Sequence, residues 1–395
     1  MKHKKIVIAG GTGFIAQAMA RYFGKDNHVI LLTRKAVSNQ NNNYDHQLIK
    51  ATDGYNITYW RWNGQHVEKH WLQDLEGADI VINLAGKSVN CRYTEKNKQE
   101  IINSRTQSTK TIGEAIRQCV VPPKLWINAS SATIYKHTTD KPNDEFTGLI
   151  SDAKKENMPY SFFDRLRYRL KKAVVQLRDG KNSYRYKDSD TDFSVKVCKS
   201  WENAFFEQRT PFTRKIALRS AITLGQGGVM VPYYNLLKMG LGGRQGNGRQ
   251  MYSWIHVEDL CRIVEWSYEQ KEMEGVFNCS APNAVTNDAF MKTLRLITGH
   301  VLGLPAPAWL LEAGAKLIGT ETELILKSCW VYPARLLQSG FVFKYNVLEH
   351  ALSDIVRHTP VRKYHFFQKQ AGPLLAKCYS LACPLSPGVG EIATI

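Results

Sequence analysis

A short stretch near the amino terminus decides the fold: Ile6-Val7-Ile8-Ala9-Gly10-Gly11-Thr12-Gly13-Phe14-Ile15-Ala16. The apolar run from Ile6 to Ala9 predicts a strand of a parallel sheet that is covered on both faces. The glycines after it predict a sharp turn whose backbone can approach a pyrophosphate. Ala16 holds the third position of that pattern, where a small residue allows close packing of helix on strand. A helix then begins near Gly13, with free N–H groups and a positive dipole end beside the turn.

The rest of the chain alternates apolar strands with helical patterns. Strands are predicted at 28–32, 57–60, 80–86, 125–129 and 215–219, and helices at 14–23, 94–119, 192–206 and 286–296. This alternation with short connections predicts an α/β fold, a Rossmann doubly wound parallel sheet. Pro305-Ala306-Pro307 then opens a segment with helical patterns at 309–318 and 323–327. It predicts a smaller, mainly helical C-terminal domain on the substrate side.

A glycine turn alone is weak evidence for a dinucleotide site, because an ordinary tight turn between strand and helix has the same composition. Here a second strand also ends where the ribose-reading residue belongs, and it ends in Thr33-Arg34 rather than in Asp or Glu. A carboxylate would bind a ribose 2′-hydroxyl, whereas arginine accommodates a 2′-phosphate. The sequence therefore predicts NADP(H) rather than NAD(H). The alternative is that Arg34 is a solvated surface residue.

Composition excludes several classes of protein. At 395 residues and 43% hydrophobic content, the chain can form one large domain or two with a substantial core. No apolar run is long enough to span a membrane and the amino terminus has no signal-peptide pattern, so we expect a cytoplasmic protein. The eight cysteines show no C-x-x-C pair and no histidines at zinc spacing, so we expect reduced cysteines and no metal site. The net charge of +18 exceeds what an anionic cofactor alone explains.

Several motifs together resemble the extended short-chain dehydrogenase/reductases. They are Gly10-Gly11-Thr12-Gly13-Phe14-Ile15, Asn83-Leu84-Ala85-Gly86, Ser104-Arg105, Ser130-Ser131-Ala132-Thr133-Ile134-Tyr135, Trp201-Glu202, Gly240-Leu241-Gly242-Gly243 and Ser253-Trp254-Ile255-His256. More narrowly, the chain resembles the YfcH-type epimerase-family branch, whose members carry an extra C-terminal domain of unknown function. The resemblance covers roughly residues 4 to 354 and is interrupted once.

The resemblance implies NADP(H) contacts in the glycine turn, after the second and fourth strands, on the long helix and on a late strand. The implied residues are Gly10, Gly11, Thr12, Gly13, Phe14, Ile15, Thr33, Arg34, Leu84, Ala85, Gly86, Glu100, Arg105 and Thr223. Each falls at a crevice between strand and helix of the predicted sheet, where such folds bind ligands. Small residues at the end of the fourth strand also leave room for a ligand there.

The chain departs from the resemblance in its chemistry. Ordinary short-chain reductases use a tyrosine four residues before a lysine to exchange a proton with the substrate oxygen. Alignment of Trp201-Glu202 with the end of that helix places Ser194 and Cys198 at the two positions, and neither can do this chemistry. Ser131 follows the fifth strand, where the resemblance implies a hydroxyl that binds a substrate carbonyl. The alternative is that the Ser131 hydroxyl caps local backbone. Ser131 and Cys198 are the catalytic candidates.

One Tyr-x-x-x-Lys does occur, at Tyr168 and Lys172, but it lies in an insertion at about 150–191 where the family has a short link. Nine basic residues and two acidic ones fall between Tyr160 and Lys187, so this pair is expected by chance. We therefore do not assign it a catalytic role.

The expected organisation has three parts. These are a NADP-binding Rossmann domain at 1–224 and 250–280, a C-terminal or lid domain at 225–249 and 281–355, and a basic tail at 356–395. Eight glycines between 225 and 248 predict mobile loops over a pocket. Four residues are candidates to line such a lid or to remain solvated: Arg219, Arg244, Arg249 and His256.

Three functions compete. The first is an atypical reductase: an NADP(H)-dependent oxidoreductase or epimerase acting on an unknown small carbonyl or nucleotide-sugar-like substrate, because hydride transfer needs mainly a bound nicotinamide and a positioned carbonyl. The second is a non-catalytic NADP(H)-dependent sensor or scaffold. The third is contact of the basic insertion and tail with nucleic acid or an anionic membrane. Solvated basic surfaces are the commoner explanation, so we do not expect nucleic-acid binding. The sequence leaves the substrate and the oligomeric state open.

Overall fold

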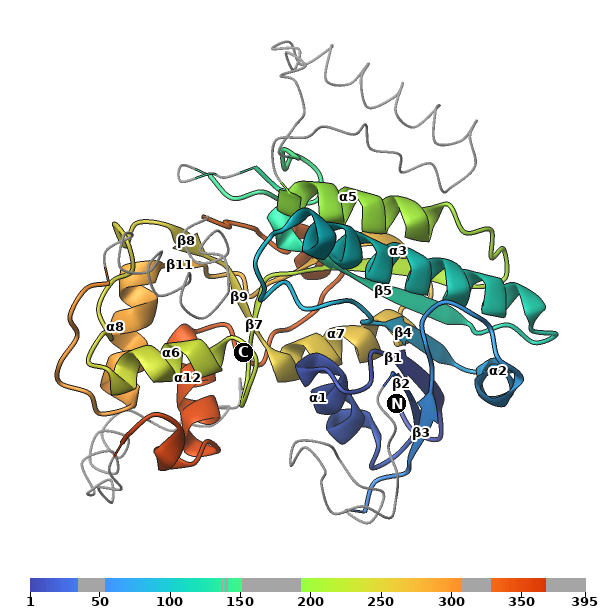
Figure 1. The fold of residues 1–395 in the computed structure, drawn as a ribbon, viewed down its shortest axis with the longest axis horizontal. Helices are drawn as coiled ribbons and strands as arrows, with labels where there is room; N and C mark the ends of the chain where they lie inside the picture. Colours follow the sequence, from blue (N-terminus) through green and yellow to red (C-terminus); the bar gives the residue numbers. More distant parts are fainter. Residues whose placement is uncertain (35–53, 137, 139–140, 151–192, 307–327, 367–395) are drawn as a thin grey trace, which may run out of the picture.

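The computed structural model describes residues 1–34, 54–136, 138, 141–150, 193–306 and 328–366. Its centre is a seven-stranded parallel sheet in the order β10-β6-β5-β4-β1-β2-β3 (Figure 1). The strands are β1 (Lys5–Ala9), β2 (His28–Thr33), β3 (Ile57–Arg61), β4 (Ile80–Asn83), β5 (Leu125–Ser131), β6 (Arg214–Ser220) and β10 (Gly275–Cys279). The first six follow the order of a doubly wound Rossmann sheet, which confirms the predicted fold class.

Helices cover both faces of this sheet. They are α1 (Phe14–Phe23) and α7 (Val257–Glu269) on one face, and α2 (Lys69–Leu75), α3 (Glu95–Gln118) and α5 (Phe193–Phe206) on the other (Figure 1). Strand β1 shows the consequence, because Ile6 and Ile8 belong to the core under α1 and α7, whereas Val7 and Ala9 belong to the core under α3 and α5. Successive strand residues point to opposite faces, so every residue of this run must be apolar.

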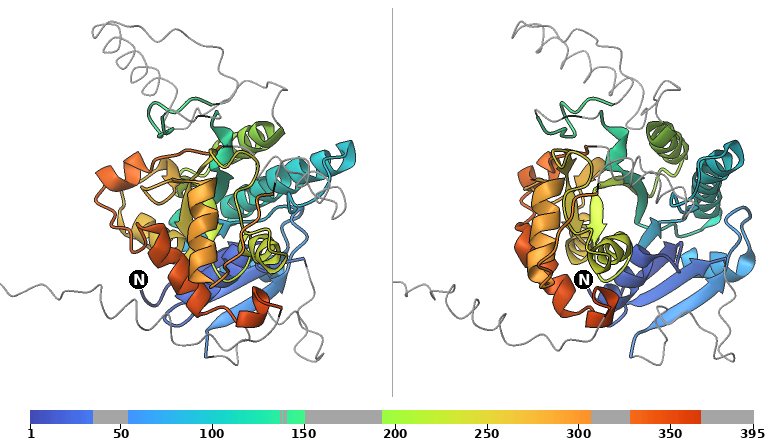
Figure 2. Two further views of the ribbon diagram at one scale, coloured as in Figure 1. Left: turned by 90° about the vertical axis from the view of Figure 1, so that its left-hand side faces the viewer. Right: turned by 60° about the vertical axis from the view of Figure 1, so that its left-hand side comes forward.

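A second, smaller core lies beside the sheet (Figures 1 and 2). It is formed by α6 (Met230–Lys238), α8 (Asn287–Ile297) and α12 (Leu348–Arg357), with the paired strands β7 (Ile222–Leu224) and β9 (Trp254–His256) and the paired strands β8 (Met251–Tyr252) and β11 (Val285–Thr286). Short elements complete the described chain: η2 (Ala132–Ile134), α11 (Ala334–Gln338) and η3 (Val361–Lys363). This second core is the mainly helical C-terminal region that the sequence predicts.

The glycine-rich region 225–248 contains a helix, so the prediction of loops throughout it is wrong. Helix α6 places Met230, Tyr233, Tyr234 and Leu237 at helical spacing, and all four side chains are buried in the second core. Apolar residues at this spacing form one face of a helix. The glycines flank the helix and conceal its pattern when only composition is counted.

Strand β4 is shorter than predicted and ends at Asn83. The side-chain Oδ1 of Asn83 accepts a hydrogen bond from the N–H of Ala85, with a distance of 3.1 Å. Asparagine favours such local turns, and this one takes the chain out of the sheet. The small residues that follow therefore form a loop at the end of the strand instead of extending it.

Several predictions fall outside the described residues. These include most of the insertion, with Tyr168 and Lys172, the helical patterns after residue 307, and the tail beyond residue 366. The first residues of the expected tail are described, and Val356 and Tyr364 are buried in the second core. Among the described helices, none combines the length and the apolar character that crossing a membrane requires.

Candidate cofactor-binding and active site

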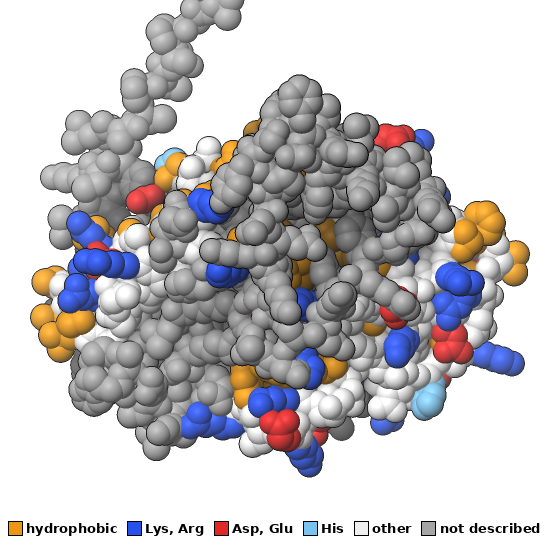
Figure 3. All heavy atoms as spheres, turned by 90° about the horizontal axis from the view of Figure 1, so that it is seen from above, with side chains coloured by type: hydrophobic (Ala, Val, Ile, Leu, Met, Phe, Trp, Pro, Cys, Tyr) orange, Lys and Arg blue, Asp and Glu red, His pale blue; other side chains and the backbone are white. Residues whose placement is uncertain are grey.

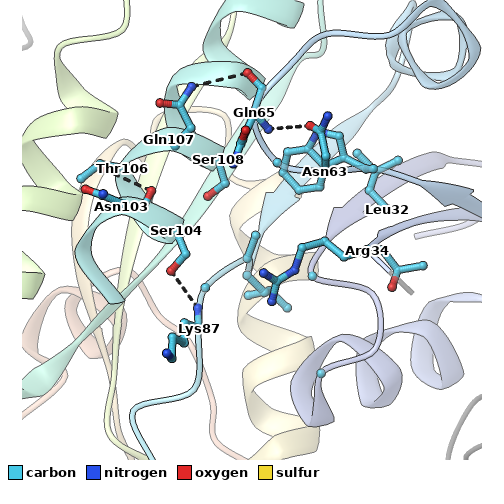
Figure 4. A pocket seen from close by; sticks show the side chains of 18 of the residues that line it. Leu32, Arg34, Asn63, Gln65, Lys87, Asn103, Ser104, Thr106, Gln107 and Ser108 are labelled. Carbon is cyan, nitrogen blue, oxygen red and sulfur yellow. Dashed lines mark hydrogen bonds between the residues drawn. The ribbon is translucent and has the colours of Figure 1, made fainter. Parts of the chain in front are cut away.

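A cleft of about 900 Å³ opens at the carboxyl ends of β1, β2 and β4. Its walls are the glycine turn, the end of β2, the loop between β3 and α2, the loop after β4, and one side of α3 (Figure 4). Nine of the residues implied for NADP(H) line it: Gly10, Thr12, Gly13, Thr33, Arg34, Leu84, Ala85, Gly86 and Glu100. The fold thus gathers distant parts of the chain at the edge where α/β sheets bind ligands.

Gly10 shows why the first turn needs glycine. Its φ angle is +87°, and an added Cβ would lie 2.9 Å from the carbonyl carbon of Leu84. A side chain here would strain the backbone and collide with the loop after β4. Helix α1 starts after Gly13, and no described side chain caps it. The N–H groups of its first turn, with the positive end of the helix dipole, are therefore available to an anion.

A buried polar cluster fixes the loop after β4. The Nδ2 of Asn83 donates to Asn128 Oδ1 at 2.8 Å and to Thr109 Oγ1 at 3.0 Å. Both asparagines are fully buried, and Trp201 Nε1 donates to the same threonine oxygen at 3.1 Å. Because the members of this cluster satisfy one another, it is a rigid support for the turn that Asn83 makes with Ala85.

The cleft carries more positive than negative charge. Arg34 and Lys110 are exposed on its walls, and neither forms an ion pair with any described residue. Figure 4 shows the Arg34 side chain extending into the open space. Lys87 instead pairs with Glu100 and donates to Asn97 Oδ1 at 2.7 Å. The hydrogen bond from Lys87 lowers the pKa of the Glu100 carboxyl. An anionic ligand therefore finds unpaired cations here.

The loop between β3 and α2 forms a wall that was not predicted from the sequence. Its cleft-lining residues are Trp62, Asn63, Gly64, Gln65 and His66. Asn63 Oδ1 accepts from the N–H groups of Gln65 at 2.7 Å and His66 at 3.1 Å, and Gly64 has a φ of +78°. An Asn-Gly pair directly after a strand is a turn signal at the edge where ligands bind. That pair could have revealed this wall.

The model of the NAD dependent epimerase/dehydratase family matches residues 6–280, from β1 to β10. The chain belongs to this family. As a family member it binds a nucleotide cofactor. A second model, a domain of unknown function (DUF1731), matches residues 306–355, where the resemblance implies an extra C-terminal domain.

Relatives within the epimerase family match over nearly their whole length. Epimerase family protein YfhF of Bacillus subtilis (strain 168) is 29% identical over 352 residues, covering 89% of this chain and 97% of YfhF. Epimerase family protein SDR39U1 of Homo sapiens is 26% identical over 360 residues, covering 89% of this chain and 99% of SDR39U1.

Solved structures show the same fold. The crystal structure of human SDR39U1 (isoform 2) with NADPH has a TM-score of 0.65 at 24% identity, covering 89% of this chain and 99% of that one. MoeE5 in complex with UDP-glucose and NAD has a TM-score of 0.60 at 15% identity, covering 89% of this chain and 97% of MoeE5.

In this epimerase-family chain the two catalytic candidates lie close together. Ser131 ends β5, and its Oγ accepts hydrogen bonds from the Oγ1 of Thr133 at 3.0 Å and from its N–H at 3.2 Å. The Thr133 Oγ1 lies 3.5 Å from Cys198 Sγ on α5. Thr133 therefore bridges the candidates, a role that was not predicted from the sequence. The bond from the N–H is the local cap that the sequence leaves open as an alternative role for Ser131.

The sequence predicts that Cys198 holds the position where an ordinary reductase carries lysine. Burial raises the pKa of its thiol, so the group stays protonated and neutral at physiological pH. Ser194, one helical turn earlier, is also buried. Neither side chain offers the acid or the positive charge of the usual pair.

Five of the implied cofactor residues do not line the cleft: Gly11, Phe14, Ile15, Arg105 and Thr223. Gly11 packs against Leu31, and the Phe14 ring packs against Gly225 and Gly228. Ile15 packs on the main core. Thr223 donates to the backbone oxygen of Ala221 at 3.4 Å.

Two candidates for the lid have structural roles instead. Arg219 is buried and forms a bidentate pair with Glu202, with both N–O distances at 2.8 Å, and its Nη1 donates to the Tyr135 hydroxyl at 2.8 Å. His256 caps α7 through Nδ1, and burial lowers its pKa, so the ring is neutral. The remaining candidates, Arg244 and Arg249, are exposed.

Proposed function

We propose that this chain is an NADP(H)-dependent oxidoreductase that transfers a hydride between the nicotinamide and a small carbonyl or alcohol substrate. The observation that carries the proposal is the cleft itself. It combines a turn that requires glycine at Gly10, a helix start after Gly13 that no described side chain caps, and Arg34, which pairs with no carboxylate of the described residues. Together these features suit a dinucleotide with an additional phosphate on its ribose.

Each part of such a cofactor has a matching part of the cleft. The first turn of α1 would hold the pyrophosphate with backbone N–H groups and its dipole. Arg34 would hold the 2′-phosphate by charge and by its planar donor geometry, with Lys110 adding positive charge from α3. The base of the cofactor would lie beside the loop from Trp62 to His66, which lines the cleft together with Arg34. The NADPH named in the human SDR39U1 structure agrees with this choice.

The chemistry needs a donor for the carbonyl oxygen. NADPH supplies the hydride when it is bound. Ser131 Oγ accepts both hydrogen bonds from Thr133, so its own proton can be donated to a substrate oxygen at the end of β5. Thr133 in turn contacts Cys198, which orients the pair of hydroxyls. The role of these residues is to bind and polarise the carbonyl.

The test uses the full chain with NADPH and a panel of aldehydes, ketones and nucleotide sugars. We expect NADPH consumption to match alcohol formation one for one with at least one substrate class, as followed by absorbance and mass spectrometry. Tight NADPH binding with no product from any member of the panel would favour the non-catalytic sensor instead. Redox-neutral conversion of a nucleotide sugar, with NADPH unchanged, would indicate an epimerase.

A further inference from the structure

A group of aliphatic side chains is exposed at the end of the molecule that carries α6 and α8, opposite to α2 (Figure 1). Met239 follows α6, Leu296 lies in the last turn of α8, and Val301, Leu302 and Leu304 lie in the segment after α8. Their exposed fractions range from 59% for Leu304 to 93% for Val301. We call these five residues the apolar tip. Exposed apolar side chains that occur singly need no explanation, whereas a group of them marks an interaction surface.

Backbone hydrogen bonds hold the apolar tip in place. The N–H of Leu304 donates to the backbone oxygen of Gly240 at 3.0 Å, and the N–H of Gly243 donates to the backbone oxygen of Leu304 at 3.0 Å. The segment after α8 therefore runs beside the loop after α6. An added Cβ on Gly243 would lie 2.4 Å from the backbone oxygen of Gly303, so this close approach requires glycine. The aliphatic side chains are thus presented by a braced backbone and not by a frayed chain end.

The charges near the apolar tip are positive. The two segments that form this end of the molecule, 228–257 and 289–306, contain five Lys and Arg residues and no Asp or Glu. Arg295 on α8 donates from Nη1 to a backbone oxygen of the loop after α6 at 3.2 Å, which places its guanidinium beside the tip. Lys292 is exposed and lies four residues before Leu296, so the two side chains share a face of α8. Aliphatic and cationic side chains therefore point out of the molecule together.

This combination matches an anionic lipid surface better than a protein partner. Tryptophan and tyrosine supply most of the binding energy at protein interfaces, and the apolar tip has neither; its residues are leucine, valine and methionine. Protruding aliphatic side chains can enter the boundary between headgroups and acyl chains, while Lys and Arg beside them contact anionic headgroups. Cations with no acid in the same segments complement an extended layer of negative charge.

We propose that the apolar tip anchors this protein reversibly on an anionic membrane surface, with Val301, Leu302 and Leu304 inserted below the headgroups and with Lys292 and Arg295 among them. A few inserted side chains give weak binding that attraction to anionic lipids strengthens, so the protein can leave the membrane again. None of the five tip residues lines the cleft. The inference is therefore independent of the proposed oxidoreductase function, and we expect NADPH affinity to be the same with and without the tip.

The first test is co-sedimentation of the full chain with vesicles of phosphatidylcholine that contain about one third phosphatidylglycerol. Val301→Ser combined with Leu302→Ser, the tip variant, should lower the partition coefficient at least about tenfold, because the apolar area that enters the bilayer is lost. Val120→Ser combined with Val342→Ser is the matched control at two other exposed valines and should bind like wild type. Absence of wild-type binding, or equal binding of wild type and the tip variant, would overturn the proposal.

The charge requirement is tested on the same vesicles. Lys292→Gln should lower the partition coefficient about fivefold, whereas Lys271→Gln, at an exposed lysine after α7, should leave it unchanged. Added salt should weaken binding of the wild type, since it screens exposed charges. Equal binding of the wild type to vesicles of phosphatidylcholine alone would overturn the choice of an anionic surface.

A further variant reports insertion directly and does not depend on the stability of the tip variant. Leu302→Trp keeps an apolar side chain at the tip, and brominated phosphatidylcholine in the anionic vesicles should quench its fluorescence beyond the quenching of wild type. Val342→Trp, at an exposed position outside the tip, should add no quenching. Absence of extra quenching in Leu302→Trp would overturn insertion. Light scattering without lipid tests the alternative occupant, a second copy of the chain: a wild-type dimer that becomes a monomer in the tip variant would overturn the membrane anchor.

Discussion

Arg34 is the residue on which the choice between NADPH and NADH depends. It directly follows β2 in the cleft and has no carboxylate partner among the described residues. Arg34→Asp should weaken NADPH binding at least tenfold, about 1.4 kcal/mol, and strengthen NADH binding, because a carboxylate repels the 2′-phosphate and accepts from the 2′-hydroxyl. Fluorescence titration of both nucleotides measures the change. Arg61→Asp makes the same charge change at an exposed position outside the cleft and should preserve the preference. An unaltered NADPH preference in Arg34→Asp would contradict the assignment.

Two effects require glycine at position 10: its positive φ and its close contact with the loop after β4. Gly10→Ala should destabilise the fold by about 1 to 3 kcal/mol and weaken NADPH binding at least tenfold, because the new Cβ strains φ and pushes on the loop after β4. Urea unfolding and nucleotide titration give the two values.

Gly340 provides the matched control for Gly10. Its φ is +85°, and an added Cβ would meet nothing within 4 Å. Gly340→Ala should therefore show the strain alone, with unchanged NADPH affinity. Equal effects of the two substitutions on NADPH binding would mean that the contact with Leu84 does not matter.

At the scale of elements, α7 joins the Rossmann sheet to the segment that leads into α12. Asp259 in its first turn is fully buried and accepts from the N–H of Lys344 at 2.9 Å and the N–H of Tyr345 at 2.8 Å. Asp259→Asn removes one acceptor and should cost about 1 to 3 kcal/mol of unfolding free energy. Glu258→Gln, which removes the charge from the surface pair with Lys344 and keeps an acceptor for the Tyr345 hydroxyl, should cost less than about 1 kcal/mol. Equal losses in urea unfolding would show that α7 is not a specific connection.

Elements with a strong local pattern were predictable, and those defined by distant partners were not. The order from β1 through the turn to α1 follows from a continuous apolar run and three glycines. Helix α6 was missed because its apolar spacing is bordered by glycines. The Asn-Gly turn at Asn63 is a local signal, but the contact of this loop with α3 is a hydrogen bond of 3.4 Å from Gln107 Nε2 to the backbone oxygen of Gln65. The bridge at Thr133 likewise depends on Cys198 on another helix. No local sequence pattern encodes such pairings, since the fold alone brings the partners together.

At the scale of the whole molecule, the net charge of +18 is not gathered into one surface patch on the face that Figure 3 shows, where Lys and Arg side chains are spread over the described part. Spread charges are typical of a solvated surface. This distribution favours the expectation that binding of small anions depends on the cleft, where Arg34 and Lys110 pair with no carboxylate in the part of the chain that the structure describes.

Acid stability should depend on Asp79, which ties together β1, β5 and α7. Its carboxylate accepts from Lys5 N–H at 3.0 Å, from Lys124 Nζ at 2.8 Å and from the Tyr268 hydroxyl at 2.7 Å. Burial alone would raise the pKa of Asp79, but the hydrogen bonds from Lys124, Tyr268 and Lys5 outweigh it and lower the pKa. A carboxyl whose pKa is lower in the folded chain than in the unfolded chain stabilises the fold at pH values above its ordinary pKa of 3.8. This contribution to stability is lost as the pH falls through the pKa of the folded chain.

Asp79→Asn should therefore lower the free energy of unfolding by about 1 to 3 kcal/mol at neutral pH, with the gap to wild type closing as the pH falls through the lowered pKa of the folded chain. Asp26→Asn, at an exposed carboxylate 3.8 Å from Lys2, is the control and should change little at any pH. Denaturant unfolding across the pH range measures both gaps. A gap for Asp79→Asn that does not depend on pH would contradict the assignment of its stabilisation to the charge.

The most direct measurement is a calorimetric titration of the full chain with NADPH and, separately, with NADH. The cleft predicts one NADPH site per chain, at least tenfold tighter than NADH, a difference of about 1.4 kcal/mol, and lost in Gly10→Ala. Absence of NADPH binding, or NADH binding that is equal or tighter, would contradict the assignment of this cleft to NADP(H).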